Sequence, residues 1–297
     1  MQGKLGCNPR HRGIGDKRWY SVKAMDSAVV FAFLVTLGAG LATAVGAAIG
    51  LFAHHTNRKF LASALGFSAG VMMYVSFVEI VPKSLDYFSL DLPTGTAGFS
   101  MVATFVAGLI GMSLLYRFLP DLEHPALGSS NPTLRLDEDP ATYYQDTALL
   151  RAGVGVAIAI TLHNFPEGLA TFFLTLDDPQ LGLSVALAIA IHNIPEGIAV
   201  VVPIYYATKS KKVAFAFGAL SGLAEPVGAL LGYWVLQPFI NDTVLGAVFA
   251  VVAGVMVYIS IDSLLPAARQ YGSGQLAIYG VIAGMAVMAA SLVLFAL

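Results

Sequence analysis

The sequence predicts an all-α membrane protein with eight transmembrane helices. Its 297 residues are 57% apolar and only 11% charged, whereas soluble domains are about 45–50% apolar and about 25% charged. An α-helix needs about 20 apolar residues to cross the hydrocarbon core of a bilayer, so eight spans would use most of the chain. The net charge of -2 excludes a generally basic surface for nucleic acid.

Eight apolar windows mark the expected spans. They cover residues 28–53, 60–81, 99–118, 148–174, 181–206, 212–236, 243–266 and 275–297. We expect residues 1–27 to form a polar tail and residues 28–297 to form a single transmembrane domain. Its one long connection is the loop 119–147, which is rich in proline, serine and acidic residues. Met25 directly precedes the first span, and the sequence leaves open whether residues 1–24 belong to the native protein.

Lysine and arginine favour the connections on one side of the membrane. Short loops keep positive charge on the cytoplasmic side. The connections after spans 2, 4 and 6 carry Lys83 alone, and those after spans 1, 3, 5 and 7 carry Arg58, Lys59, Arg117, Arg135, Arg151, Lys209, Lys211, Lys212 and Arg269. Both termini are therefore expected outside the cytoplasm, although the basic residues of the tail favour the opposite orientation.

Two segments of the chain recur at almost the same offset. AGVMMYVSFVEIVP at 69–82 returns as AGVMVYISIDSLLP at 253–266, and LATAVGAAIG at 41–50 returns as LAEPVGALLG at 223–232. An offset of five spans reverses the direction of the chain, so helices 1–3 and 6–8 should form an inverted repeat around helices 4 and 5, as in many secondary transporters. Small residues recur in any packed membrane bundle, but two runs in register favour a true repeat.

The fourth and fifth spans share a shorter motif that carries the chemistry. LHNFPEGLA begins at residue 162 and IHNIPEGIA begins at residue 191. His163 and Glu167 are four residues apart, as are His192 and Glu196, so each pair lies on one face of its helix. Because an α-helix rises by about 1.5 Å per residue, all four side chains are expected near the middle of the membrane.

Acidic residues within the spans need a partner, because an unpaired charge in the bilayer is costly. We expect every lysine and arginine to lie outside the spans or at their ends, so the partner of these acids is a proton or a cation. Protonated carboxyls that only donate hydrogen bonds are the alternative for any single acid. Imidazole nitrogen beside carboxylate oxygen suits Zn²⁺, Fe²⁺, Mn²⁺, Co²⁺ or Ni²⁺. One shared ion and two adjacent ions are both compatible with the spacing.

Further polar side chains lie along the expected path. Glu225 reaches a depth similar to that of the motifs, and its partner in the repeat is Thr43. Glu79 is expected near the outer end of helix 2 and Asp262 near the inner end of helix 7, either as entrance and exit acids or as solvated end residues. Met72 offers a thioether near the path, although methionine on such a helix more often only packs.

HNFPEG and HNIPEG on consecutive spans, together with SGLAEP and AGVM-x-Y, resemble the ZIP (Zrt/Irt-like) family of divalent metal transporters, and in particular its bacterial ZupT-like branch. The resemblance covers about residues 28–297. It implies these metal ligands: His163, Asn164, Glu167, His192, Asn193, Glu196 and Glu225. Ser263 stands where many members have an acid.

The same resemblance implies import of Zn²⁺ through the cell membrane into the cytoplasm, by a homodimer, with Fe²⁺, Mn²⁺, Co²⁺ and Cd²⁺ as further candidate substrates. Helices 1, 4, 5 and 6 would move against helices 2, 3, 7 and 8 in an elevator-like cycle. The metal is then the substrate, and neither a separate cofactor nor a catalytic residue is expected.

Two alternatives remain open. An exporter would use the same residues with the opposite direction of flux. A membrane metalloenzyme is less compatible with the motifs, because di-iron proteins use Glu-x-x-His and zinc peptidases use His-Glu-x-x-His. The sequence does not choose between passive flux and coupling to protons.

Overall fold

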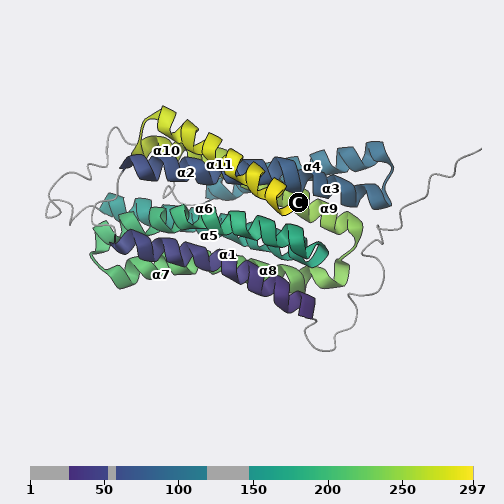
Figure 1. Cartoon of the computed structure of the whole chain (residues 1–297), viewed down its shortest axis with the longest axis horizontal. Coiled ribbons are helices and arrows are strands. Elements are labelled where there is room, and N and C mark those ends of the chain that lie inside the picture. The colour runs from purple at the N-terminus through teal and green to yellow at the C-terminus, as the bar shows by residue number, and fades with distance from the viewer. Residues whose placement is uncertain (1–26, 53–57, 119–146, 297) are drawn as a thin grey trace, which may run out of the picture.

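The computed structural model describes residues 27–52, 58–118 and 147–296, and all regular structure in these ranges is helical (Figure 1). The α-helices are α1 (Ser27–Phe52), α2 (Arg58–Val75), α3 (Val81–Asp91), α4 (Thr94–Phe118), α5 (Thr147–Asp177), α6 (Pro179–Thr208), α7 (Lys211–Gly222), α8 (Ala224–Leu236), α9 (Asp242–Ile259), α10 (Leu265–Tyr271) and α11 (Gly274–Ala296). The predicted polar tail and the predicted loop 119–147 lie almost entirely outside the described residues.

Short irregular turns join several of these helices into longer rods. The π-helical turn η1 (Ser76–Ile80) joins α2 to α3, and the π-helical turn η4 (Ser260–Leu264) joins α9 to α10. The 3-10 turn η3 (Gln237–Phe239) follows α8, which itself continues α7. Such π turns are rare and often occur at functional sites.

Within the described residues, seven helical rods are long and apolar enough to cross a membrane. They are Ser27–Phe52, Ala62–Asp91, Thr94–Arg117, Pro179–Thr208, Lys211–Phe239, Asp242–Arg269 and Gly274–Leu294. The 31-residue α5 runs beside α6 and is an eighth long rod, whose apolar run is interrupted by His163, Asn164 and Glu167 (Figure 1). The chain is therefore an all-helical polytopic membrane protein, as the composition predicts.

The second and seventh predicted spans are too short. The rods that contain them continue to Asp91 and Tyr271, so Glu79 and Asp262 lie inside rods and not at their ends. Lys83 lies within the span that ends at Asp91, contrary to the expectation that every basic residue lies outside the spans or at their ends. Its ammonium group forms an ion pair with the carboxylate of Asp177. The base that ends the apolar window is thus paired within a helix that continues to Asp91.

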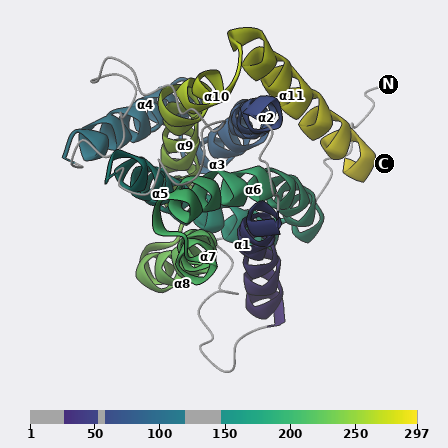
Figure 2. The same ribbon diagram turned by 90° about the vertical axis from the view of Figure 1, so that its left-hand side faces the viewer.

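The helices form two blocks on opposite sides of the molecule (Figure 2). We call α1, α5, α6, α7 and α8 the motif block, and α2, α3, α4, α9, α10 and α11 the frame block. The closest glycine contacts join helices of the same block. A Cβ on Gly46 of α1 would lie 2.0 Å from the carbonyl oxygen of Ile194 on α6, and one on Gly108 of α4 would lie 2.3 Å from that of Val251 on α9. Each block is thus packed backbone to backbone, as small residues allow.

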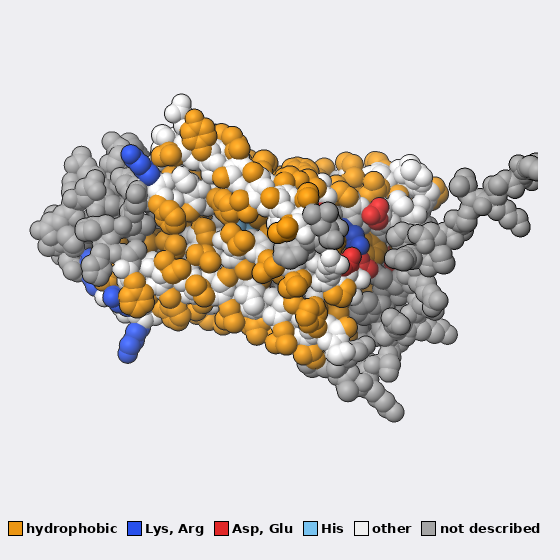
Figure 3. Space-filling model, viewed as in Figure 1, with side chains coloured by type: hydrophobic (Ala, Val, Ile, Leu, Met, Phe, Trp, Pro, Cys, Tyr) orange, Lys and Arg blue, Asp and Glu red, His pale blue; other side chains and the backbone are white. Residues whose placement is uncertain are grey.

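The two ends of the molecule differ in charge, and a broad apolar surface separates them (Figure 3). The end that holds the α6–α7 and α10–α11 turns carries these described basic residues: Lys59, Arg117, Lys209, Lys211, Lys212 and Arg269. The opposite end holds the α3–α4, α5–α6 and α8–α9 turns. There the described side chains include Asp86, Asp91, Asp177, Asp178, Asp242 and the paired Lys83.

Candidate metal centre

The two motifs lie side by side because α5 and α6 form an antiparallel pair joined by a tight turn. His163 precedes the end of α5 at Asp177 by nearly the same number of residues as His192 follows the start of α6 at Pro179. At about 1.5 Å per residue, both histidines are therefore about 20 Å from the same turn. Asp178 caps α6 by accepting hydrogen bonds from the backbone N–H groups of Gln180 and Leu181. This cap and the antiparallel packing place both motifs at one level.

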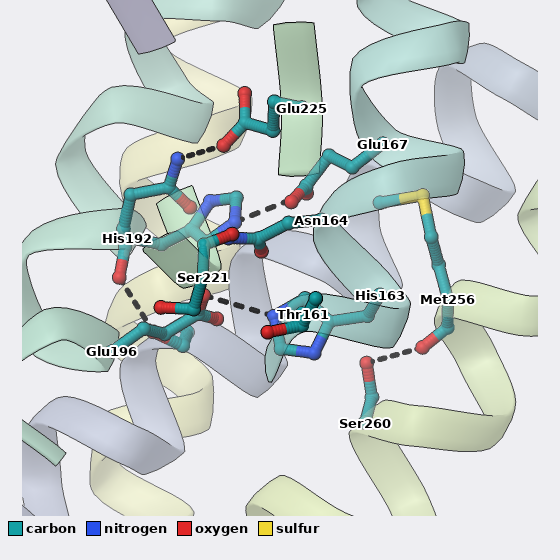
Figure 4. Close-up of polar contacts among 12 residues, drawn as sticks. Thr161, His163, Asn164, Glu167, His192, Glu196, Ser221, Glu225, Met256 and Ser260 are labelled. Carbon is teal, nitrogen blue, oxygen red and sulfur yellow. Dashed lines mark hydrogen bonds and ion pairs between the residues drawn. The ribbon is translucent and has the colours of Figure 1, made fainter. Parts of the chain in front are cut away.

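Each histidine pairs with the glutamate of the opposite motif. The Nε2 atom of His163 lies 2.9 Å from Oε2 of Glu196, and Nε2 of His192 lies 3.1 Å from Oε1 of Glu167. Figure 4 shows these side chains pointing toward one another across the two helices. All four side chains are buried, with no more than 1% of any of them exposed. The contacts therefore run between helices and not along one helix face.

The two asparagines are held by backbone carbonyls of neighbouring helices. Nδ2 of Asn164 donates to the carbonyl oxygen of Ser221 on α7 at 3.0 Å, and Nδ2 of Asn193 donates to that of Ala39 on α1 at 2.9 Å. Asn193 also donates to Oε1 of Glu225. Both Oδ1 atoms are buried without a hydrogen-bond partner, and the bonds of the amide nitrogens fix the direction in which they point.

The centre contains several further polar atoms that are buried and unpartnered. They are Nδ1 of His163, Oε2 of Glu167, Oε1 of Glu196 and Oε2 of Glu225. A buried polar atom without a partner costs about 1–3 kcal/mol, so a cluster of them requires an explanation such as a bound ion. No lysine or arginine is among the buried residues of the described chain. The centre is a concentration of nitrogen and oxygen donors with no lysine or arginine among the described residues buried with it.

Among the described residues, no three His, Cys, Asp or Glu side chains converge in a geometry that could hold a metal ion. Each imidazole meets a carboxylate of the opposite motif directly. Imidazole and carboxylate nevertheless are the donor types that first-row transition metals prefer. A bound ion would have to separate each imidazole from its carboxylate, because a metal needs the free lone pair of imidazole.

The remaining predicted residues are distributed as follows. Glu225 begins α8 and joins the centre through Asn193. Met72 is fully buried in α2, whereas Glu79 and Asp262 are half-buried within η1 and η4. Among the described contacts, neither acid forms a hydrogen bond or an ion pair with the centre, so the structure does not bring them into it.

Sequence reasoning missed a contact between the two blocks. The hydroxyl of Ser68, on α2, donates to the backbone carbonyl oxygen of His192 at 3.0 Å. Ser68 is fully buried. Serine is common on helices rich in small residues, so nothing in the sequence distinguishes Ser68 from serines that only pack.

Comparisons with known proteins agree with one another. The family model described as "ZIP Zinc transporter" matches residues 128–292. The chain is 53% identical over 275 residues to the protein named zinc transporter ZupT of Nitratidesulfovibrio vulgaris, covering 91% of this chain and 99% of that protein. It is 51% identical over 265 residues to the ZupT of Chlorobium limicola, covering 89% and 98%. For the ZupT of Streptococcus mutans the identity is 47% over 271 residues, covering 91% and 100%.

Proposed function

This chain belongs to the ZIP zinc transporter family, and from that premise we propose that it imports Zn²⁺ through the cell membrane into the cytoplasm. It is thus a multi-pass transporter and not an enzyme. The observation that carries the proposal is the fully buried group of imidazoles, amide oxygens and carboxylates, beside which the described residues include no buried lysine or arginine. Fe²⁺, Mn²⁺, Co²⁺ and Cd²⁺ are further candidate substrates because the same donor types bind them.

The proposed ligands are His163, Asn164, Glu167, His192, Asn193, Glu196 and Glu225. An incoming dication separates each imidazole from the glutamate of the opposite motif, and these groups replace the water of the hydrated ion. Met72 and the half-buried acids Glu79 and Asp262 remain proposed path residues outside this ligand set.

The proposed inverted repeat of helices 1–3 and 6–8 is supported by matching local geometry. The turns η1 and η4 begin at Ser76 and Ser260, which occupy the same position in the two recurring segments 69–82 and 253–266. In η1 the serine hydroxyl donates to the carbonyl oxygen of Met72 at 2.7 Å, and in η4 it donates to that of Met256 at 2.8 Å. The same rare turn thus occurs at the same repeat position.

Packing around the motifs supports the same symmetry. A Cβ on Gly46 of α1 would lie 2.0 Å from the carbonyl oxygen of Ile194, and one on Gly228 of α8 would lie 2.1 Å from that of Phe165. The two glycines are repeat partners, and Ile194 and Phe165 occupy the same position in the two motifs. Helix α1 therefore packs on α6 as α8 packs on α5.

The proposed elevator-like movement is supported by the division into two blocks. All seven proposed ligands lie on α5, α6 and α8, so the whole centre belongs to the motif block. Polar contacts that cross to the frame block include those of Ser68 with His192 and of Lys83 with Asp177. A sliding motif block would have to break both contacts while its own backbone packing stays intact.

Orientation and assembly complete the proposal. The basic end of the molecule suits the cytoplasmic side under the positive-inside rule, which supports an orientation with both termini outside the cytoplasm. Residues 28–297 are proposed to form one transmembrane domain. A homodimer is proposed from the family resemblance. The apolar side chains that α4 exposes, such as Phe99 and Ile110, at 75% and 54% exposure, are compatible with contact to lipid or to a second copy.

Uptake of zinc into liposomes that contain only the purified protein tests the proposal. We expect His163→Ala and Glu167→Ala to abolish uptake while the proteins still insert and purify normally, because each change removes a proposed ligand. Uptake by either variant at the rate of the parent protein would contradict the assignment. The nearest alternative is an exporter. In liposomes in which the orientation of the protein has been determined, an exporter would carry zinc from its cytoplasmic face to its outer face.

A further inference from the structure

Thr43 of α1 has a buried hydroxyl group with no hydrogen-bond partner. Buried threonines in helices usually donate to the carbonyl four residues earlier. Here Thr36 donates to Ala32 and Thr171 donates to Glu167, each at 2.9 Å. The same bond is made by Thr104, Thr161, Thr175 and Thr208. Thr43 departs from this pattern, and a buried polar group without a partner requires a reason.

The reason lies in the metal centre. Four residues before Thr43 is Ala39, and the carbonyl oxygen of Ala39 accepts a hydrogen bond from Nδ2 of Asn193 at 2.9 Å. The usual acceptor of the threonine hydroxyl is therefore engaged by the amide of a proposed ligand. The hydroxyl hydrogen of Thr43 therefore lacks its usual acceptor, and no donor of the described chain occupies the lone pairs of its oxygen.

Thr43 lies where α1 packs against the end of α7, next to a residue that holds the centre. Its hydroxyl oxygen is 3.2 Å from the position of a Cβ on Gly222, the residue after Ser221, whose carbonyl holds Asn164. One turn earlier on the same helix, the position of a Cβ on Gly40 is 3.3 Å from Cβ of Glu225. The free hydroxyl thus lies where α1 crosses the helices that carry Ser221 and Glu225.

Thr43 also occupies the repeat position of Glu225, as the alignment of segment 41–50 with segment 223–232 shows. The two residues contact equivalent points of the two motifs. A Cβ on Gly168 would lie 2.1 Å from the carbonyl oxygen of Glu225, and one on Gly197 would lie 2.0 Å from that of Thr43. The backbone of α1 at Thr43 therefore meets the α6 motif as the backbone of α8 at Glu225 meets the α5 motif.

We propose that the Thr43 hydroxyl is a further oxygen ligand of the transported metal ion and a determinant of its selectivity. This inference rests on the proposed function. A hydroxyl replaces one water of the ion without adding charge. The buried centre therefore has three carboxylates, from Glu167, Glu196 and Glu225, whereas a glutamate at the position of Thr43 would give it four. A hard oxygen donor also favours Zn²⁺ and Mn²⁺ over the softer Cd²⁺.

Replacing the hydroxyl by a thiol tests whether this atom faces the ion. Cys7 is the one cysteine of the chain, so Thr43→Cys is made in a Cys7→Ser background and titrated with Cd²⁺ in detergent. We expect the ultraviolet charge-transfer band of a cadmium–thiolate bond and a rise of about tenfold in the ratio of Cd²⁺ to Zn²⁺ uptake. Thr36→Cys is the matched control, because Thr36 is equally buried on the same helix and should give neither effect.

A second pair of variants tests the same inference if the Thr43→Cys protein does not fold. Thr43→Val keeps the shape and removes the oxygen, whereas Thr43→Ser keeps the oxygen. We expect the valine variant to bind Zn²⁺ about tenfold more weakly with undiminished thermal stability, because it removes an unpartnered buried hydroxyl. The serine variant should bind as the parent does.

The outcomes separate the inference from the proposed function. If the Cys7→Ser parent takes up no zinc, the proposed function fails. If the parent takes up zinc but Thr43→Cys shows no thiolate band and Thr43→Val binds zinc as the parent does, the function stands and the ligand role of Thr43 is wrong.

Discussion

The buried centre and the acidic end of the molecule both hold ion pairs, but the pairs are built differently. At the acidic end, Lys83 and Asp177 are a base and an acid with 24% and 20% of their side chains exposed. In the centre, Glu167 and Glu196 meet only imidazoles, and all of these side chains are fully buried. The end pair neutralises itself, whereas the centre has more acid than base. In this chain, the proposed metal ligands are the buried acids without a lysine or arginine partner, and the acid that has such a partner lies outside the centre.

The largest expected effect comes from removing the acids of the centre. The double variant Glu167→Gln and Glu196→Gln keeps the shape of both side chains but cannot offer the same charge to a cation. We expect Zn²⁺ affinity, measured by calorimetry on the purified protein, to fall by on the order of 100-fold or more. Thermal stability should fall, because each change removes the charged partner of a buried imidazole. If the double variant bound zinc as tightly as the parent protein, the acids of the centre would not be the zinc ligands, and the centre would not differ from the acidic end in this respect.

An intermediate effect is expected from the packing that holds the centre in place. In Gly197→Ala the new Cβ would lie 2.0 Å from the carbonyl oxygen of Thr43, so α1 and α6 must move apart. We expect a loss of about 1–3 kcal/mol of stability, as for other overpacked sites, seen as a lower melting temperature in detergent. Gly38→Ala is the control, since nothing lies within 4 Å of its added Cβ. Equal melting temperatures for the two variants would show that close packing at Gly197 is not required.

The smallest effect is expected at the acidic end. Because the Lys83–Asp177 pair is partly exposed, Lys83→Ala should cost no more than about 1 kcal/mol of stability and leave zinc affinity within about twofold of the parent. A charge-swapped protein with Lys83→Asp and Asp177→Lys should recover the lost stability. If Lys83→Ala weakened zinc binding as strongly as loss of the central acids, the acidic end would belong to the ion-binding machinery and the contrast between the two regions would fail.

Much of the fold could be predicted because long apolar runs have few alternatives to membrane-spanning helices. The errors occur where polar residues interrupt such a run. The apolar windows assign Lys83 to a loop, although its pairing with Asp177 keeps it inside a helix that reaches Asp91. The same windows place Glu79 and Asp262 too near the helix ends. Apolarity along one segment does not reveal a partner that another helix supplies.

The candidate site shows the same division. The spacing of His163, Glu167, His192 and Glu196 predicts their common depth, because the rise of a helix is constant. It does not predict which histidine meets which glutamate. The asparagines illustrate a second gap, since the direction of each amide depends on a backbone carbonyl of α1 or α7. The sequence of the motif does not show which backbone carbonyls of other helices its side chains will meet.

Composition and periodicity by themselves determined the membrane class, the doubled motif and the depth of its residues, because these follow from the length and rise of single helices. Only the tertiary structure decided that the His–Glu pairs cross between α5 and α6, that Ser68 contacts His192 from the frame block, and that Asn193 takes the acceptor which Thr43 would otherwise use. These features depend on how one helix surface meets another, and that meeting is set by the packing of small residues on helices far apart in the chain.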